Sequence, residues 1–361
     1  MIIKSIKLEN FRNYDKLDIN FNDGTNILYG DNAQGKTNIL EAIYLSGTTK
    51  SHKGSKDREI IKFDQEESHI RTIILKNGIE YKLDMHLRKN KTKGIAINGI
   101  PIRKASELFG IVNIVFFSPE DLNIIKNGPS ERRRFIDLEL CQLDKVYLHN
   151  LTKYNNIINQ RNKLLKDISF RSDLRDTLSV WNLQLVNYGK KIIERRKIFI
   201  HQINDIIYDI HYKLSGGKEE LYIKYEQNVS EELFLNNLEK NIERDIKLGT
   251  TSVGPHRDDL NFLNKNIDIR KYGSQGQQRT AALSLKLSEI ELVTKLINDK
   301  PILLLDDVLS ELDSNRQNYL LNSINNTQTL ITCTGLDEFI NNRFCIDKIY
   351  KVEDGTVLEE N

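Results

Sequence analysis

Cysteine is scarce in this chain, and long apolar runs are missing from it. The three cysteines among 361 residues, Cys141, Cys333 and Cys345, are widely spaced and follow no metal-ligand pattern. This spacing argues against a disulfide framework and against a zinc site, and it suits a reducing compartment. No segment approaches the roughly 18 apolar residues of a membrane-spanning helix, and the start of the chain lacks the pattern of a signal peptide. We therefore expect a cytoplasmic protein without a membrane partner.

The chain also has no large excess of positive or negative charge. It contains 53 lysines and arginines and 51 acidic residues, so its formal net charge is +2. Any affinity for nucleic acid would have to come from local basic clusters. The candidate clusters are Lys50, His52, Lys53, Lys56 and Arg58; His86, Arg88, Lys89, Lys91 and Lys93; Arg132, Arg133 and Arg134; and Lys190, Lys191, Arg195, Arg196 and Lys197. They lack interleaved aromatic residues, which favours contacts to the phosphates of duplex DNA, with a solvated face as the alternative for each cluster.

A glycine-rich segment carries the strongest functional pattern. It reads Gly30-Asp31-Asn32-Ala33-Gln34-Gly35-Lys36-Thr37 and fits the phosphate loop of nucleotide-binding proteins. Residues 26–29 before it predict a buried strand, and residues 37–45 after it have apolar residues at helical spacing. Phosphates bound there would lie at a helix N-terminus, where free N–H groups favour an anion. The segment therefore predicts a nucleoside triphosphate site, with a chance glycine-rich turn as the alternative.

Each residue type at the motif positions of this loop has a chemical role in binding phosphate. Gly30 and Gly35 let the backbone curl so that successive N–H groups point at phosphate oxygens. Lys36 is expected to reach the β- and γ-phosphates, and the Thr37 hydroxyl is expected to ligate Mg²⁺. The residues between the glycines complete the predicted nucleotide-binding set.

A second pattern lies far downstream, where an apolar run ends in two carboxylates. Residues 301–307 read Pro-Ile-Leu-Leu-Leu-Asp-Asp, as a central parallel strand would end at the catalytic edge of an α/β sheet. This run resembles a Walker B strand. On that interpretation Asp306 holds Mg²⁺, and Asp307 orients and polarises the water that attacks the γ-phosphate. The alternative is a buried strand whose aspartates only start a turn.

A third pattern, in residues 272–279, distinguishes between classes of nucleotide-binding protein. It reads Tyr-Gly-Ser-Gln-Gly-Gln-Gln-Arg and leads into a predicted helix over residues 280–297. Ser274, Gly276 and Gln277 match the S-x-G-Q core of the ABC-type ATPase signature, although such a turn can also be an ordinary helix cap. In that superfamily two heads enclose two ATP molecules, and each phosphate loop faces the other subunit's signature. The resemblance thus implies ATP and Mg²⁺ as cofactors and an ATP-dependent homodimer.

The spacing of these motifs predicts an inserted lobe. Lys36 and Asp306 are further apart than a transporter ATPase usually requires, and residues 308–313 match the D-loop that follows Walker B in the superfamily. Trp181, Leu185, Tyr188 and Ile192 recur at helical steps, and Gly216-Gly217 ends that pattern. We expect an α/β fold, an ABC-type ATPase head with a mixed sheet and flanking helices. Residues 1–117 and 250–361 would form the head, and residues 118–249 a mainly helical arm lobe.

Two hairpins are also expected. Residues 70–75 and 81–87 alternate apolar and polar side chains on either side of Asn77-Gly78, a strong turn pattern. Residues 259–263 and 267–271 are expected to pair in the same way and to position the signature.

Taken together, the motifs resemble those of the RecF family of bacterial recombination mediators, whose heads are similar to those of SMC and double-strand-break repair ATPases. The resemblance covers nearly the whole chain. It is carried by Leu8-Glu9-Asn10-Phe11-Arg12-Asn13-Tyr14, the phosphate loop, Ser51-His52-Lys53, residues 116–122, residues 128–134, residues 251–259 and the signature. It implies binding to double-stranded and gapped DNA, RecO and RecR as partners, and RecA loading as the outcome. The ATPase would be weak, stimulated by DNA, and used as a dimerisation switch.

Departures from the wider ABC pattern affect the expected rate of hydrolysis. Residues 330–334 read Leu-Ile-Thr-Cys-Thr and lack the histidine that transporters place after this strand, so a hydroxyl or another group would sense the γ-phosphate. Asp307 stands where the catalytic glutamate is usual, and Glu120 is the candidate substitute for a missing glutamine after residues 111–117. We therefore expect slow hydrolysis.

Two further assignments stay open at this point. Arg12 resembles a residue of related repair ATPases that touches nucleotide in cis, and a solvated arginine at a strand end is the alternative. His256, Arg257 and Asp258 either contact nucleotide or brace the signature hairpin.

Two other classes of protein use similar motifs. An ATPase subunit of a membrane transporter would dock membrane helices, but the missing histidine and the long insertion count against it. An ATP-dependent nuclease needs an acidic metal cluster in an added domain, and no such domain fits in this sequence.

Overall fold

The structure, a computed structural model, describes residues 1–324, 326–336 and 346–360, so Cys345 lies outside the described residues. The chain forms two compact units, residues 1–121 with 286–361 and residues 122–285. The first boundary lies close to the one expected after residue 117. The second differs from the expectation: it lies inside helix α10 (Gln275–Ile297) instead of after residue 249, because a strand within residues 250–285 pairs inside the second unit.

The first unit contains a six-stranded sheet with the order β15-β14-β3-β13-β12-β8. Its strands are β3 Thr25–Tyr29, β8 Ile114–Phe117, β12 Ile302–Asp306, β13 Thr329–Cys333, β14 Lys348–Glu353 and β15 Thr356–Glu360. Neighbouring strands are parallel, except that β14 and β15 form an antiparallel hairpin. The apolar runs of β8 and β12 are buried, as expected for strands covered on both faces. The strands predicted at residues 26–29, 301–307 and 330–334 are confirmed.

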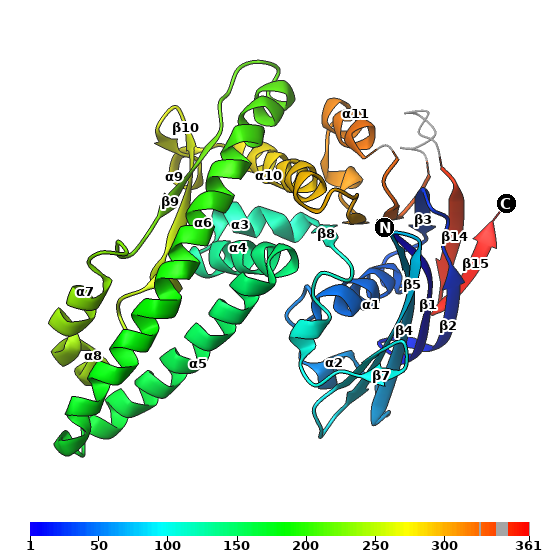
Figure 1. The fold of residues 1–361 in the computed structure, drawn as a ribbon. Helices are drawn as coiled ribbons and strands as arrows, with labels where there is room; N and C mark the ends of the chain where they lie inside the picture. Colours follow the sequence, from blue (N-terminus) through cyan, green and yellow to red (C-terminus); the bar gives the residue numbers. More distant parts are fainter. Residues whose placement is uncertain (325, 337–345, 361) are drawn as a thin grey trace. The chain divides into compact units, whose positions relative to one another are not determined.

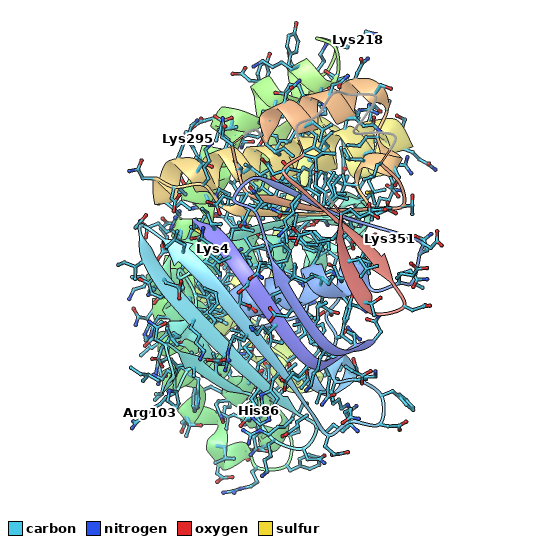
Figure 2. The ribbon with its side chains drawn as sticks, turned by 90° about the vertical axis from the view of Figure 1, so that its right-hand side faces the viewer. Lys4, His86, Arg103, Lys218, Lys295 and Lys351 are labelled. Atoms are coloured by element: carbon cyan, nitrogen blue, oxygen red, sulfur yellow. The ribbon has the colours of Figure 1, made fainter. Side chains whose placement is uncertain are left out.

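A second, antiparallel sheet in the same unit has the order β2-β1-β4-β5-β6-β7 (Figure 2). Its strands are β1 Ile2–Phe11, β2 Tyr14–Asn20, β4 Glu67–Lys76, β5 Ile79–Arg88, β6 Gly94–Ile97 and β7 Ile100–Pro101. Side chains alternate between a buried face, which includes Ile70 and Ile74, and an outer face. The hairpin predicted across Asn77-Gly78 is confirmed, and both turn residues have positive φ, as such a turn requires.

Helix α1 (Lys36–Thr48) packs between the two sheets of the first unit (Figure 1). It contacts β4 of the antiparallel sheet and β8, β12 and β13 of the other sheet. Ile39, Leu40 and Ile43 are fully buried in these contacts. The helix begins directly after the phosphate loop, so its N-terminus is fixed at the end of β3. Helices α2 (Asp57–Ile60) and α11 (Ser314–Ser323) also belong to this unit.

The second unit is mainly helical, as predicted for the inserted lobe. Its helices are α3 Leu122–Lys126, α4 Pro129–Leu143, α5 Lys145–Ile168, α6 Leu178–Leu214, α7 Phe234–Lys240, α8 Ile242–Leu248, α9 Ile269–Tyr272 and the first part of α10. Helices α5 and α6 are antiparallel, because Arg161 bonds to Asn182 whereas the earlier Tyr147 bonds to the later Arg196. Helix α6 ends just before Gly216, as predicted. Among the described residues, no helix combines the length and apolar character needed to cross a lipid bilayer.

The second unit also contains a small sheet with the order β11-β10-β9, formed by β9 Tyr222–Glu226, β10 Asp259–Asn264 and β11 Ile267–Asp268. Strand β9 was not predicted from the sequence. The hairpin expected over residues 259–271 is only partly correct, because residues 269–271 are helical. The Asp268 carboxylate ends the strand by accepting hydrogen bonds from the backbone N–H groups of Arg270 and Lys271 at 2.8 and 3.3 Å, which caps α9.

Candidate nucleotide-binding site

The predicted phosphate loop connects β3 to α1 and depends on its glycines. Gly30, Ala33 and Gly35 have φ values of 147°, 67° and 114°, in the region that favours glycine. A Cβ atom on Gly35 would lie 2.6 Å from both the Asn13 amide nitrogen and the Tyr14 hydroxyl. A Cβ atom on Gly30 would clash with the backbone oxygen of Val352. The close approach of other segments therefore requires glycine at both ends of the loop.

The loop is held by segments from both ends of the chain. The Asn13 side chain, in the turn between β1 and β2, donates to the Gln34 carbonyl at 3.0 Å and accepts from the Asn38 amide at 2.8 Å. The backbone N–H of Asp354, in the turn between β14 and β15, donates to the Gln34 side chain at 2.6 Å. Asp31, Asn32 and Ala33 remain exposed at the outer side of the loop. The loop thus has a fixed base and an open outer surface.

Lys36 begins helix α1 and is buried, with 7% of its surface exposed. Its ammonium group donates to the carbonyl oxygens of Gly30 and Asp31 at 2.6 and 2.7 Å. Burial lowers the pKa of Lys36, while the nearby Asp307 and Asp306 carboxylates oppose this shift. The two hydrogen bonds hold the ammonium group inside the loop, where the phosphates of a nucleotide would need its positive charge.

The carboxylates at the end of β12 meet the loop at the same edge of the parallel sheet. Asp306 Oδ1 accepts hydrogen bonds from the hydroxyls of Thr37 and Thr332, each at 2.7 Å. Hydroxyl and carboxylate oxygens are the hard donors that Mg²⁺ prefers, so Thr37 and Asp306 fit the magnesium site predicted for them. Strand β13 lies between β3 and β12, which explains how Thr332 reaches Asp306.

Asp307 is fixed by the neighbouring strand. Its φ of 52° is in the left-handed region. Its backbone N–H donates to Thr332, at 3.0 Å from the hydroxyl and 3.2 Å from the carbonyl oxygen. The sequence indicated only that a hydroxyl or another group would replace the missing histidine. In the structure, the Thr332 hydroxyl orders both aspartates, which the sequence did not reveal.

An ion pair between the partly exposed Arg12 and the buried Glu41 joins helix α1 to the first strands. Arg12 donates to both carboxylate oxygens of Glu41 at 2.7 and 2.8 Å, and Ser51 also donates to Glu41. Although burial opposes it, this hydrogen bonding lowers the pKa of Glu41 below its ordinary value. Arg12 further donates to Ser55 and to the Glu59 carbonyl, both at 2.8 Å. The structure thus gives Arg12 a bracing role one helical turn from the phosphate loop, and its contact with nucleotide stays a prediction.

Sequence reasoning missed Glu41. The available signal was a carboxylate in the apolar part of a predicted helix, because a buried charge requires a partner. Glu120, the candidate for the missing glutamine, is exposed in the short 3₁₀ turn after β8. It is Asp121 that has a defined contact there, accepting from the Ser118 N–H at 2.8 Å.

The predicted signature begins helix α10 with a capping box. The Ser274 N–H donates to the Gln277 side chain at 2.8 Å, and the Gln277 N–H donates back to the Ser274 hydroxyl at 3.2 Å. Gln277 also donates to Glu219 at 2.9 Å. Ser274 and Gly276 are exposed, and a Cβ atom on Gly276 would have no neighbour closer than 3.8 Å. The positive end of a 23-residue helix is therefore presented to solvent, with its cap formed locally.

The residues after the arm form an internal network in the second unit. His256 donates from Nε2 to the Thr251 carbonyl at 3.0 Å, and its Nδ1 accepts from the Tyr154 hydroxyl at 2.8 Å. Burial lowers the pKa of His256 to about 4, so this arrangement of a neutral ring is maintained. Asp258 accepts from Arg196 at 3.0 Å and from Tyr225. These contacts favour the bracing interpretation of His256 and Asp258.

Several residues of the predicted basic clusters are internal. Arg132 is 1% exposed and donates to both oxygens of Asp259 at 2.6 and 3.0 Å. Arg196 is 2% exposed and is bound to Asp137 and Asp258. Neither arginine lies on a solvated face or is available to contact DNA. Each is buried, and carboxylates compensate its charge. In contrast, four residues of the first cluster are exposed: Lys50, Lys53, Lys56 and Arg58.

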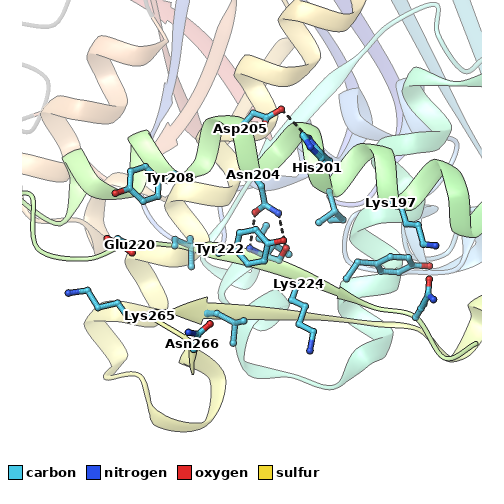
Figure 3. A pocket seen from close by; sticks show the side chains of 16 residues that line it. Lys197, His201, Asn204, Asp205, Tyr208, Glu220, Tyr222, Lys224, Lys265 and Asn266 are labelled. Carbon is cyan, nitrogen blue, oxygen red and sulfur yellow. Dashed lines mark hydrogen bonds and ion pairs between the residues drawn. The ribbon is translucent and has the colours of Figure 1, made fainter. Parts of the chain in front are cut away.

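A cavity of about 800 Å³ lies in the second unit and is lined mainly by α6 and β9 (Figure 3). Asn204 on α6 holds the edge of β9, donating to the carbonyl oxygen and accepting from the N–H of Ile223, both at 2.8 Å. The lining includes no residue of the predicted nucleotide site. A cradle of backbone N–H groups needs no deep cavity, so the loop and carboxylate geometry identify the candidate site.

Comparison with known proteins agrees with these motifs. The family described as RecF/RecN/SMC N terminal domain matches residues 2–357. The DNA replication and repair protein RecF of Agathobacter rectalis is 68% identical, over 99% of this chain and 99% of its own length. A solved structure of the recombination mediator protein RecF-ATP in the RecFOR pathway is 38% identical, with a TM-score of 0.93 over 99% of this chain and 97% of that chain.

A more distant structure shows the fold alone. The Smc head bound to the C-winged helix domain of ScpA has a TM-score of 0.58 at 17% identity, covering 100% of this chain and 98% of that chain. The expected ABC-type ATPase head with its additional helical unit is confirmed by these structures and by the two sheets described above. The chain therefore belongs to the RecF family of DNA replication and repair proteins.

Proposed function

We propose that this chain is an ATP-dependent clamp for duplex DNA in recombinational repair. ATP would join two copies, and each phosphate loop would face the signature of the other copy. Slow hydrolysis would then open the dimer. The ATPase, stimulated by DNA, would thus serve as a switch that controls how long the clamp stays closed.

The observation that supports this proposal most strongly is the convergence of the loop, Thr37, Asp306 and Thr332 at one edge of the parallel sheet. Lys36 would exchange its bonds to the loop carbonyls for bonds to the β- and γ-phosphates. Thr37 and Asp306 would hold Mg²⁺, which supplies positive charge where negative charge develops on the phosphates. Similarity to the RecF-ATP structure supports ATP as the nucleotide.

The second half of the site is proposed to come from the partner copy. Ser274, Gly276 and Gln277 would contact the γ-phosphate held by the opposite phosphate loop. Support comes from the exposure of the α10 N-terminus, because exposed N–H groups at the positive end of a long helix favour an anion. The capping box keeps the Ser274 hydroxyl in a fixed position, so little ordering would be needed on closure.

Hydrolysis is proposed to be slow and to depend on Asp307. Its backbone is fixed by Thr332, beside the proposed magnesium ligand Asp306. The Asp307 carboxylate would orient the attacking water, but it is one methylene shorter than the usual glutamate. Thr332 stands in place of the histidine. Because its hydroxyl already donates to Asp306, the γ-phosphate would have fewer protein contacts.

DNA is proposed to bind through phosphate contacts, without sequence specificity. The exposed Lys50, Lys53, Lys56 and Arg58 are candidates, as are the exposed Lys190 and Lys191 of the arm, whereas Arg132 and Arg196 are excluded by burial. The RecFOR pathway of the similar solved structure supports RecO and RecR as partners, and we extend this to RecA loading at gaps.

The test is duplex-DNA binding by the purified protein with ATP, with ADP and without nucleotide. We expect tight binding only with ATP. Replacing Lys53 and Lys56 together by alanine should weaken binding and reduce its salt dependence by about two charges. The same change at Lys240 and Lys247, two exposed lysines outside the candidate clusters, is the matched control. Equal affinity with ATP and ADP would contradict the proposed clamp.

A further inference from the structure

The outer face of the antiparallel sheet carries two histidines and a glutamate outside the nucleotide site. His69 on β4 and His86 on β5 are direct cross-strand partners, and their rings stack with centroids 4.0 Å apart at 22°. Glu67 is two residues before His69 and therefore lies on the same face. The side chains of Glu67, His69 and His86 are 53%, 45% and 33% exposed. Strand pairing thus holds these three side chains close together, and all three are accessible from solvent.

The distances between these groups suit a shared metal ion. His86 Nε2 is 2.8 Å from one Glu67 oxygen, and His69 Nε2 is 3.9 Å from the other. One possible ligand atom from each residue lies within 4.8 Å of the other two. Ligands bound tetrahedrally at zinc distances are about 3.4 Å apart, so the observed separations bracket the required value. Small side-chain rotations would bring all three atoms to one ion.

We propose that Glu67, His69 and His86 bind a divalent transition metal ion, with Zn²⁺ as the best fit. Two imidazoles and one carboxylate form the donor set of three-ligand zinc sites, which leave a fourth position open and need none of the cysteines whose spacing argued against zinc. Because the ligands come from β4 and β5, the bound ion would clip these two strands together.

The surroundings leave room for the open fourth position. A hollow of about 330 Å³ adjoins both histidines. Gly94, the cross-strand partner of His86 on the far side of β5, keeps this space free of a side chain. Two cations that line the hollow have carboxylate partners, Arg71 with Asp84 at 2.5 Å and Lys7 with Asp18 at 2.6 Å. The partner carboxylates partly neutralise these two positive charges, so the cations repel a bound metal ion less strongly.

The experiment is isothermal titration calorimetry, in which Zn²⁺ is added to the nucleotide-free protein. An Asp306→Asn background keeps the proposed magnesium site from competing. We expect one Zn²⁺ per chain, and His69→Ala or His86→Ala should weaken binding by about 100-fold or more, since even the loss of an outer contact to a metal ligand costs 10–100-fold. His201→Ala is the matched control, because His201 and Asp205 form an exposed pair at 3.2 Å elsewhere (Figure 3).

A second measurement separates ligand loss from unfolding. With Co²⁺ in place of Zn²⁺, the wild type should show the visible bands of a four-coordinate ion without a thiolate band, whereas the His69→Ala protein should lose these bands and keep its circular dichroism. Absence of stoichiometric Zn²⁺ binding in the wild type would overturn the proposal and leave an ordinary surface ion pair. Unchanged affinity in both histidine variants would also overturn it.

Discussion

The phosphate loop and the signature are both helix N-termini suited to phosphate, but they are held in different ways. Residues distant in sequence hold the loop, since Asn13 and Asp354 bond to Gln34 and Thr37 bonds to Asp306. The signature is capped locally, by a capping box within four residues, and Gln277 adds one contact to the more distant Glu219. The loop is thus a property of the folded first unit, whereas the signature is an exposed helix tip. This difference suggests that the tip acquires its ligand from another molecule.

The largest expected effect concerns the chemistry at the loop. Asp307→Asn should lower ATP turnover by about 100-fold or more, because a positioned base contributes a factor of this order. ATP binding should remain, and the ATP-dependent dimer should last longer. Steady-state turnover and the dimer lifetime in size-exclusion chromatography check this. An unchanged turnover rate would remove Asp307 from its proposed role.

A change at the signature should act on assembly without affecting ATP binding. Ser274→Arg places a long side chain where the partner's γ-phosphate is proposed to lie, and it should weaken the ATP-dependent dimer by about 30-fold or more. Ser274→Ala is the control, since it removes the capping hydroxyl without adding bulk. Sedimentation with ATP checks both variants. Dimers that persist at wild-type strength in Ser274→Arg would count against the signature assignment.

A pair of glycine substitutions tests the contrast between the two helix ends directly. Gly35→Ala should lower the free energy of unfolding by about 1–3 kcal/mol, because its φ of 114° and the nearby Asn13 and Tyr14 leave no place for a methyl group. Gly276→Ala should leave stability equal or raise it by up to about 1 kcal/mol, since alanine favours a helix and the site is open. Urea unfolding measures both. A Gly276→Ala variant as unstable as Gly35→Ala would remove the contrast.

The last expected effect is a pH dependence located in the second unit. The pKa of His256 is about 4 in the folded chain and about 6.5 when unfolded, so the unfolded state binds more protons between these values. Stability should therefore fall as pH falls, by about 2 kcal/mol between pH 7.5 and pH 5. His256→Gln should show a pH dependence smaller by this amount in urea unfolding. An identical pH profile would show that His256 is not the titrating group.

Much of the first unit was predictable from the sequence because its motifs are local. The phosphate loop, the strand ending at Asp306 and the turn at Asn77-Gly78 each show their chemistry within a few residues. The Arg12–Glu41 pair and the Thr332 bond to Asp306 were missed, because no local pattern indicates which charged or polar groups meet after folding. For the same reason, the buried Arg132 and Arg196 resembled exposed basic clusters.

The central claim is that each bound nucleotide lies between two copies of this chain, and mixing two inactive variants tests it most directly. Lys36→Ala lacks a working loop, and Ser274→Arg lacks a working signature, so each variant alone should be inactive. In a mixed dimer one of the two sites would contain an intact loop and an intact signature. The account predicts that ATPase activity returns on mixing. Mixed dimers that form but stay inactive, or activity in a strictly monomeric protein, would contradict it.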